Sequence, residues 1–145
     1  MAGERNLWNT MRTHMKPLGV VERVENSAGA GTPDVTYCLA GVSGWVELKA
    51  LDDWPVRPAT TISIPKLKKE QVEWLSRWHK AGGRAYMLLQ VQRQYVLLDP
   101  MTTRDVYERT LVKEALLQRA LLTHTGNFPT LRLAHLLTSQ ESRGA

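Results

Sequence analysis

Two short, mostly apolar runs, 35–40 and 45–51, flank a turn bounded by glycines, 41–44. This pattern predicts two neighbouring strands joined as a hairpin. Side chains alternate along a strand, so residues two apart share a face. Glu47 and Lys49 are therefore expected on one face of the second strand, while the residues beside them turn to the other face.

The other segments alternate between helix-like and strand-like patterns. We expect helices at 3–16 and 66–81, the second ending at the Gly82-Gly83 pair, with Leu67, Val72, Leu75 and Trp78 toward the core. Further strands are expected at 20–24, 85–91 and 95–98, a glycine-rich loop at 26–32, and helices at 104–122 and 130–138. This order predicts an α/β fold, a mixed central β-sheet flanked by helices, in a single domain spanning 1–145.

The composition limits the class of protein. Hydrophobic residues make up 43% of the 145 residues, which predicts a packed core rather than disorder. The single cysteine, Cys38, has no disulfide partner and is expected to be a core thiol. The chain has no long apolar run and opens with a polar segment, so we expect no membrane association and a cytoplasmic location, in a cell or a virus-infected host cell.

The charge is unevenly distributed along the chain. Residues 1–54 carry five Lys/Arg against seven Asp/Glu, whereas residues 55–80 carry six against two and residues 81–145 carry eight against five. An acidic first third beside a basic remainder is typical of an enzyme that holds a cation in one place and phosphates around it. An ordinary basic surface would give the same total.

Asp34, Glu47 and Lys49 form the set of residues with the clearest chemical meaning. Asp34 enters the first strand of the hairpin, which can bring its carboxylate beside Glu47. Two adjacent carboxylates repel one another unless a cation lies between them, and Mg²⁺ prefers such oxygen ligands. Lys49 would then stand beside the cation, where an ammonium can orient water and offset charge on a phosphate. Each motif taken alone is more often structural, but their order and spacing favour catalysis.

Pro33-Asp34 followed by Glu47-Leu48-Lys49 resembles the signature of the PD-(D/E)XK nucleases. The wider pattern is similar to the archaeal-type, and phage-encoded, Holliday-junction resolvases of that superfamily. It includes Glu4-Arg5-Asn6-Leu7 in the first helix, the small-residue loop around Ser27, and a basic loop and helix with Gln71 near its start. The resemblance covers about residues 3–98, which would form a restriction-endonuclease-like core, and leaves 99–145 as a C-terminal helical extension.

The resemblance implies a Mg²⁺-dependent endonuclease, with Mn²⁺ as a substitute, that acts as a homodimer on branched DNA such as a four-way junction. Asp34 and Glu47 would be metal ligands, Lys49 the catalytic lysine, and Glu4 an additional carboxylate from the first helix. Glu4 precedes Leu7, Trp8 and Met11 at helical spacing, so it is expected on the inward-facing side. Glu22 and Glu25 are rival carboxylates that are closer to Asp34 in the sequence.

Other residues are candidates for DNA binding. Ser27 would bind a phosphate or a metal-bound water, or only cap its own loop, and Gln71 would orient Lys49 or a phosphate, or have no function. The basic candidates for phosphate contacts are Arg57, Lys66, Lys68 and Lys69, with Arg5, Arg12 and Lys16 as a second cluster. Two other functions stay open: a repair or replication nuclease that acts on flaps or duplex DNA, and an inactive DNA-binding module of the same fold.

Overall fold

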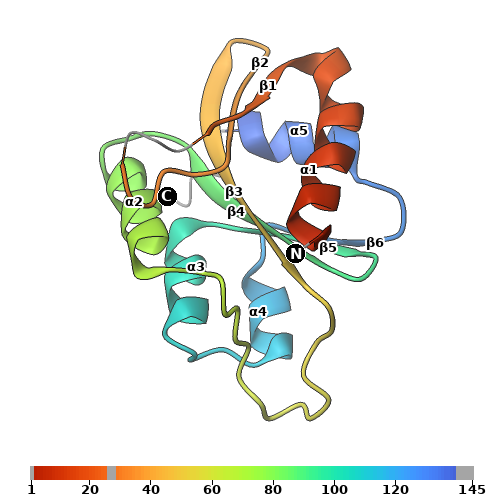
Figure 1. Ribbon diagram of the computed structural model, residues 1–145, viewed down its shortest axis with the longest axis vertical. Coiled ribbons are helices and arrows are strands. Elements are labelled where there is room, and N and C mark those ends of the chain that lie inside the picture. Colours follow the sequence, from red (N-terminus) through yellow and green to blue (C-terminus); the bar gives the residue numbers. More distant parts are fainter. Residues whose placement is uncertain (1, 26–28, 140–145) are drawn as a thin grey trace.

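A six-stranded mixed sheet runs through the molecule and carries helices on both faces (Figure 1). The computed structural model describes residues 2–25 and 29–139. The helices are α1 (Ala2–Met15), the 3-10 turn η1 (Lys16–Leu18), α2 (Lys69–Lys80), α3 (Pro100–Tyr107), α4 (Lys113–Arg119) and α5 (Thr130–Thr138). The strands are β1 (Gly19–Arg23), β2 (Val35–Leu39), β3 (Val42–Leu51), β4 (Ala85–Val91), β5 (Gln94–Leu98) and β6 (Leu122–Thr125).

The strands lie side by side in sequence order, β1 to β6. All neighbouring pairs are antiparallel except β3 and β4. These two are parallel because α2 carries the chain back to the end of the sheet at which β3 begins. Pairing of β2 with β3 ends at Val35 opposite Val46, while β3 continues along β4 as far as Leu51. The second half of β3 therefore has one edge that β2 does not cover.

Two hydrophobic clusters fill the two faces of the sheet. On one face, α1 and α5 pack over a cluster that includes Val46 and Leu48 of β3. On the other face, α2, α3 and α4 cover a cluster that includes Met87 and Leu89 of β4. Glu47 and Lys49 lie opposite these two β4 residues, so their side chains emerge on the α2 face.

The expected mixed sheet with flanking helices is confirmed, and so are the hairpin and the helix before the glycine pair. The turn is shorter than expected, because β3 already begins at Val42, and α2 begins at Lys69 rather than at residue 66. The continuous helix at 104–122 is wrong. α3 ends at Tyr107, Arg109 takes a positive φ of 59°, and α4 is a separate short helix. Residues 122–125 form β6 on the edge of β5, so the C-terminal extension also contributes a strand.

Two smaller expectations are also corrected. Cys38 is exposed, because it lies on the outward face of β2 between the buried Tyr37 and Leu39. Trp78 is 41% exposed rather than part of the core, because it lies at the rim of α2 with one side against Gly83. Within residues 2–25 and 29–139, no helix has the length and apolar character needed to cross a membrane.

Candidate active site

Asp34 lies where β2 and β3 separate, and two backbone contacts fix its position. The backbone N–H of Val24 donates to the carbonyl of Asp34 at 2.7 Å. The carboxylate oxygen Oδ2 of Asp34 accepts a hydrogen bond of 2.9 Å from the backbone N–H of Leu48. This side-chain hydrogen bond takes the place of the next backbone hydrogen bond between β2 and β3. It directs the Asp34 carboxylate at the segment that carries Glu47 and Lys49.

Glu47 is fully buried, and one of its oxygens is held from two sides. Oε2 lies 3.1 Å from the ammonium nitrogen of Lys49, which is itself only 3% exposed. The same oxygen accepts a hydrogen bond of 3.1 Å from the side-chain amide of Gln71 at the start of α2. The sequence had suggested that Gln71 orients Lys49 or a phosphate, whereas the contact it makes is with Glu47.

The pKa of Glu47 is raised to about 9. The largest cause is burial, which disfavours the charged form, and the second is the nearby negative charge of Asp34. Lys49 acts in the opposite direction but does not cancel these two effects. A carboxyl group placed in this way is costly to ionise unless a further positive charge comes close to it.

The loop before Asp34 packs directly on α2 through Gly31. Gly31 has a φ of +87°, and a Cβ built on it would lie 2.2 Å from the carbonyl oxygen of Glu70. Only glycine allows so close an approach in this conformation. The close approach brings the segment that leads to Asp34 against the same turn of α2 that supplies Gln71.

The arrangement fits a divalent cation beside Glu47. Oε1 of Glu47 is buried and has no hydrogen-bond partner among the described residues. A buried acceptor without a partner costs free energy, and a hard cation that prefers oxygen ligands would satisfy it. Asp34 and Glu47 would hold Mg²⁺ as a carboxylate pair. The described residues contain no group of three or more His, Cys, Asp or Glu side chains suited to a metal.

Glu4 lies on α1, beside a different part of β3 from Glu47. It is half-buried on α1 and lines a cavity of about 300 Å³ with Ala50, Asp52 and Lys66. The start of α1 touches β3 there, since a Cβ on Gly3 would lie 3.0 Å from that of Ala50. Glu4 is therefore positioned past Lys49, toward the far end of the strand. The rivals Glu22 and Glu25 are both exposed, on β1 and just after it.

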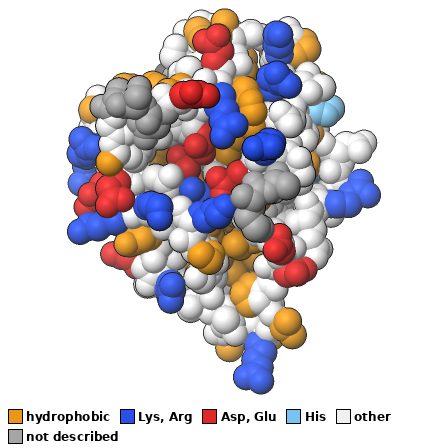
Figure 2. Space-filling model, viewed as in Figure 1, with side chains coloured by type: hydrophobic (Ala, Val, Ile, Leu, Met, Phe, Trp, Pro, Cys, Tyr) orange, Lys and Arg blue, Asp and Glu red, His pale blue; other side chains and the backbone are white. Residues whose placement is uncertain are grey.

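The candidate DNA-binding residues are mostly on the surface. Figure 2 shows Lys and Arg side chains spread over one face of the molecule, several of them bordering Asp and Glu side chains near its middle. The exposed candidates are Arg5, Arg12, Lys16, Arg57, Lys66, Lys68 and Lys69. Arg12 and Lys16 line a hollow beside β1, Lys69 forms an ion pair of 4.0 Å with Glu73, and Ser27 lies outside the described residues.

An aromatic cluster beside the carboxylates was only partly anticipated. Trp74 and Trp78 of α2 stack with their ring centroids 4.7 Å apart. Trp45, two residues before Glu47 on β3, meets both rings edge-on at 5.3 and 6.0 Å. Trp74 and Trp78 are four residues apart on one helix, whereas Trp45 joins them only because α2 packs on β3. Trp54 lies apart from this cluster: its indole N–H donates to the side chain of Gln94, and the ammonium group of Lys113 lies over its ring.

The fold has counterparts among solved structures. Hjc of Archaeoglobus fulgidus, a Holliday junction resolvase from an archaeal hyperthermophile, is 18% identical in sequence, with a TM-score of 0.54 over 83% of this chain and 93% of that chain. A VRR_NUC domain is also 18% identical, with a TM-score of 0.45 over 74% of this chain and 97% of that one. No protein-family model and no curated protein matches the sequence. The likeness to Hjc shows that the chain has a restriction-endonuclease-like fold.

Proposed function

We propose that this protein is a Mg²⁺-dependent DNA endonuclease whose active site is Asp34, Glu47 and Lys49. One observation carries the proposal: Glu47 is fully buried between Asp34 and Lys49, with one oxygen held by two donors and the other without a partner among the described residues. A solvated Glu-x-Lys pair on a strand would have neither the burial nor the unpartnered oxygen. The fold shared with Hjc supports the same assignment.

The residues divide the chemistry between them. A cation held by Asp34 and Glu47 would neutralise charge at the phosphate and would lower the pKa of the attacking water. Lys49 is held beside Glu47, and its ammonium group orients that water and stabilises the negative charge that develops on the phosphate oxygens. Gln71 donates to Oε2 of Glu47, which would leave Oε1 available to a bound cation.

The test of the active site is the pair of substitutions Asp34→Asn and Glu47→Gln. Each removes a metal-binding charge with little change of shape, so cleavage in Mg²⁺ is expected to be lost while DNA affinity stays within a few-fold of the parent. Glu114→Gln, which changes an exposed carboxylate on α4, is the matched control. Substantial cleavage by either active-site variant would overturn the assignment.

For the substrate, we propose branched DNA, with a four-way junction cut by a homodimer. Hjc, which shares the fold, is a Holliday junction resolvase. An isologous dimer presents two identical sites related by a two-fold axis, which suits the approximate two-fold symmetry of a junction. The metal site itself is equally suited to a flap or a linear duplex, so the substrate has to be decided by experiment.

The substrate test compares a synthetic four-way junction, a flap and a linear duplex in Mg²⁺, with the oligomeric state measured by light scattering. We expect a dimer that makes two nearly symmetric nicks in the junction and retains this activity against excess unlabelled duplex. A monomer that cuts flaps or duplex as readily would favour the repair or replication nuclease. Binding without any cleavage would favour the inactive DNA-binding module.

A further inference from the structure

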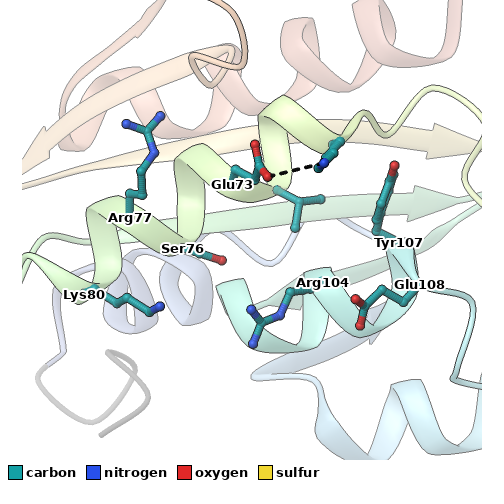
Figure 3. A pocket seen from close by; sticks show the side chains of 9 residues that line it. Glu73, Ser76, Arg77, Lys80, Arg104, Tyr107 and Glu108 are labelled. Atoms are coloured by element: carbon teal, nitrogen blue, oxygen red, sulfur yellow. Dashed lines mark ion pairs between the residues drawn. The ribbon is translucent and has the colours of Figure 1, made fainter.

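A groove between α2 and α3 lies outside the site described above. Its volume is about 370 Å³, and Figure 3 shows the side chains that line it. Lys69, Ser76 and Lys80 come from α2, Arg104 and Tyr107 come from α3, and Glu108 directly follows α3. Four cationic side chains and two carboxylates contribute to the lining in all, which gives the groove an excess of positive charge.

Two of the cations are available to bind a ligand. In Figure 3, Lys80 and Arg104 are directed into the space between the two helices, near the hydroxyl of Ser76, whereas Arg77 is directed away from α3. The ion pair in this lining joins Lys69 to Glu73, and over the described part of the chain Lys80 and Arg104 form none. An ammonium and a guanidinium facing one gap, beside a hydroxyl, form a suitable binding site for a phosphate group.

The groove lies across α2 from the carboxylates. In an α-helix each residue turns about 100°, so Ser76 and Lys80 lie about 140–180° around the axis from Gln71. Gln71 contacts Glu47, and the groove therefore opens on the opposite side of the same helix. A helix with its side chains is about 10–12 Å across, so a DNA strand held at Glu47 is separated from the groove by the whole thickness of α2.

We propose that this groove binds backbone phosphates of a second DNA segment, an arm of the branched substrate other than the one held at the catalytic carboxylates. The inference rests on the proposed nuclease function, because that function supplies the polyanion. A branched DNA extends arms in diverging directions, so one arm can occupy the active site while another passes the far side of α2. Lys80 and Arg104 are the phosphate contacts, and Tyr107, 39% exposed, lines another part of the same groove (Figure 3).

The experiment measures the salt dependence of binding by the full-length protein. Labelled four-way junction, and a linear duplex with the sequence of one arm, are titrated in Ca²⁺, which allows binding with little turnover. The variant is Lys80→Gln/Arg104→Gln. Each phosphate contact contributes about 0.9 to the slope of log K against log[salt], so loss of two lowers the junction slope by about 1.8 and the affinity about tenfold or more in moderate salt. Duplex affinity is expected to stay within about twofold.

Two control variants distinguish the loss of phosphate contacts in the groove from a change in net charge, and melting temperatures distinguish it from a loss of folding. Arg93→Gln/Arg132→Gln removes the same charge from exposed residues that line no part of this groove, and it is expected to leave the slope nearly unchanged. Lys80→Arg/Arg104→Lys keeps both charges and is expected to keep the parent slope. Melting temperatures of all variants show whether the fold is intact.

The proposed groove is overturned if the neutralised variant binds the junction with the parent slope, or if junction and duplex affinities fall equally. Failure of the nuclease assignment has a different signature, which is absence of cleavage by the parent protein in Mg²⁺. The salt slopes still report on the groove in that case, so the two outcomes are distinguishable.

Discussion

The side-chain amide of Gln71 donates a hydrogen bond of 3.1 Å to Oε2 of Glu47 and so joins the start of α2 to the strand that carries the carboxylate. The orientation of this amide is fixed, because its carbonyl oxygen accepts a hydrogen bond of 3.0 Å from the backbone N–H of Lys68. One glutamine thus caps a helix and holds a buried glutamate at the same time. The helix start and the candidate active site are thereby coupled.

Replacing Gln71 by alanine should therefore impair cleavage more than binding. Without the amide donor, Glu47 gains rotamer freedom, and we expect the single-turnover rate to fall about tenfold, or about 1.4 kcal/mol in barrier. The Mg²⁺ concentration for half-maximal rate should rise, and DNA affinity should be unchanged. Gln118→Ala, an exposed glutamine on α4, is the control. Equal rates and equal metal dependence for the two variants would remove the positioning role of Gln71.

Metal binding is expected to release a proton. The pKa of Glu47 is about 9 in the metal-free protein, so this group is largely protonated at about pH 7.5. A cation favours the carboxylate form, so each Mg²⁺ bound should displace nearly one proton. The proton release should vanish well above about pH 9. Below about pH 9, the affinity for Mg²⁺ should increase by up to about tenfold for each unit by which the pH is raised.

Calorimetry of Mg²⁺ binding in buffers of different ionisation enthalpy measures this release directly. Glu47→Gln lacks both this proton and the metal-binding charge, so it is expected to show neither the proton release nor the parent Mg²⁺ affinity. A parent protein that binds Mg²⁺ near neutral pH with no proton release would show that Glu47 is already ionised, and the raised pKa would then be wrong.

Gly31 and Gly41 offer a matched pair for testing the contact between the loop and α2. Both have positive φ, at +87° and +81°, but a Cβ on Gly41 would meet nothing within 4 Å, whereas one on Gly31 would meet the backbone of Glu70. Gly41→Ala should therefore cost only the strained conformation, about 1–2 kcal/mol of unfolding free energy. Gly31→Ala should cost more, and should also lower the cleavage rate because it displaces the segment that carries Asp34.

Urea unfolding and single-turnover cleavage of the two glycine variants decide this point. If both lose the same stability and both keep the parent rate, the Gly31 contact does not position the site. A selective loss of rate in Gly31→Ala, at a temperature where both variants are folded, would support it.

The hairpin and the spacing of Glu47 and Lys49 could be predicted because both depend on local patterns. Strand alternation alone determines that the two side chains share a face. The hydrogen bond between Gln71 and Glu47 could not be predicted from spacing, because only the packing of α2 on the sheet brings these two residues together. The same is true of Trp45 and its contacts with the α2 tryptophans.

The segment 104–122 shows where local pattern fails. The segment was expected to form one helix, but the chain turns at Arg109, and a second helix, α4, begins at Lys113. Residues 122–125 then pair with β5 at the edge of the sheet. A four-residue edge strand is stabilised by its neighbour rather than by its own propensity, so its sequence contains little signal.

Glu4 remains our prediction for the additional carboxylate. It is half-buried in the cavity with Ala50, just past Lys49 on β3, whereas Glu25 is exposed. A half-buried carboxylate that lines a cavity next to the catalytic strand can contact DNA or a cation there, whereas an exposed one is mostly solvated. Glu4→Ala is expected to lower the cleavage rate at least about tenfold, or about 1.4 kcal/mol in barrier. Glu25→Ala is expected to stay near the parent rate.

A purely structural role of Glu4 would give a different pattern from a functional one. Glu4→Gln keeps the shape and the packing against β3 but removes the charge, so it should behave like Glu4→Ala if the carboxylate acts on the cation or on the attacking water. If Glu4→Gln has the parent rate, the side chain only packs. If Glu25→Ala is inactive while Glu4→Ala cuts normally, the additional carboxylate comes from the end of β1 instead. Rates measured over a series of Mg²⁺ concentrations add a second readout, because a lost metal contact raises the concentration for half-maximal rate, whereas lost packing lowers only the melting temperature.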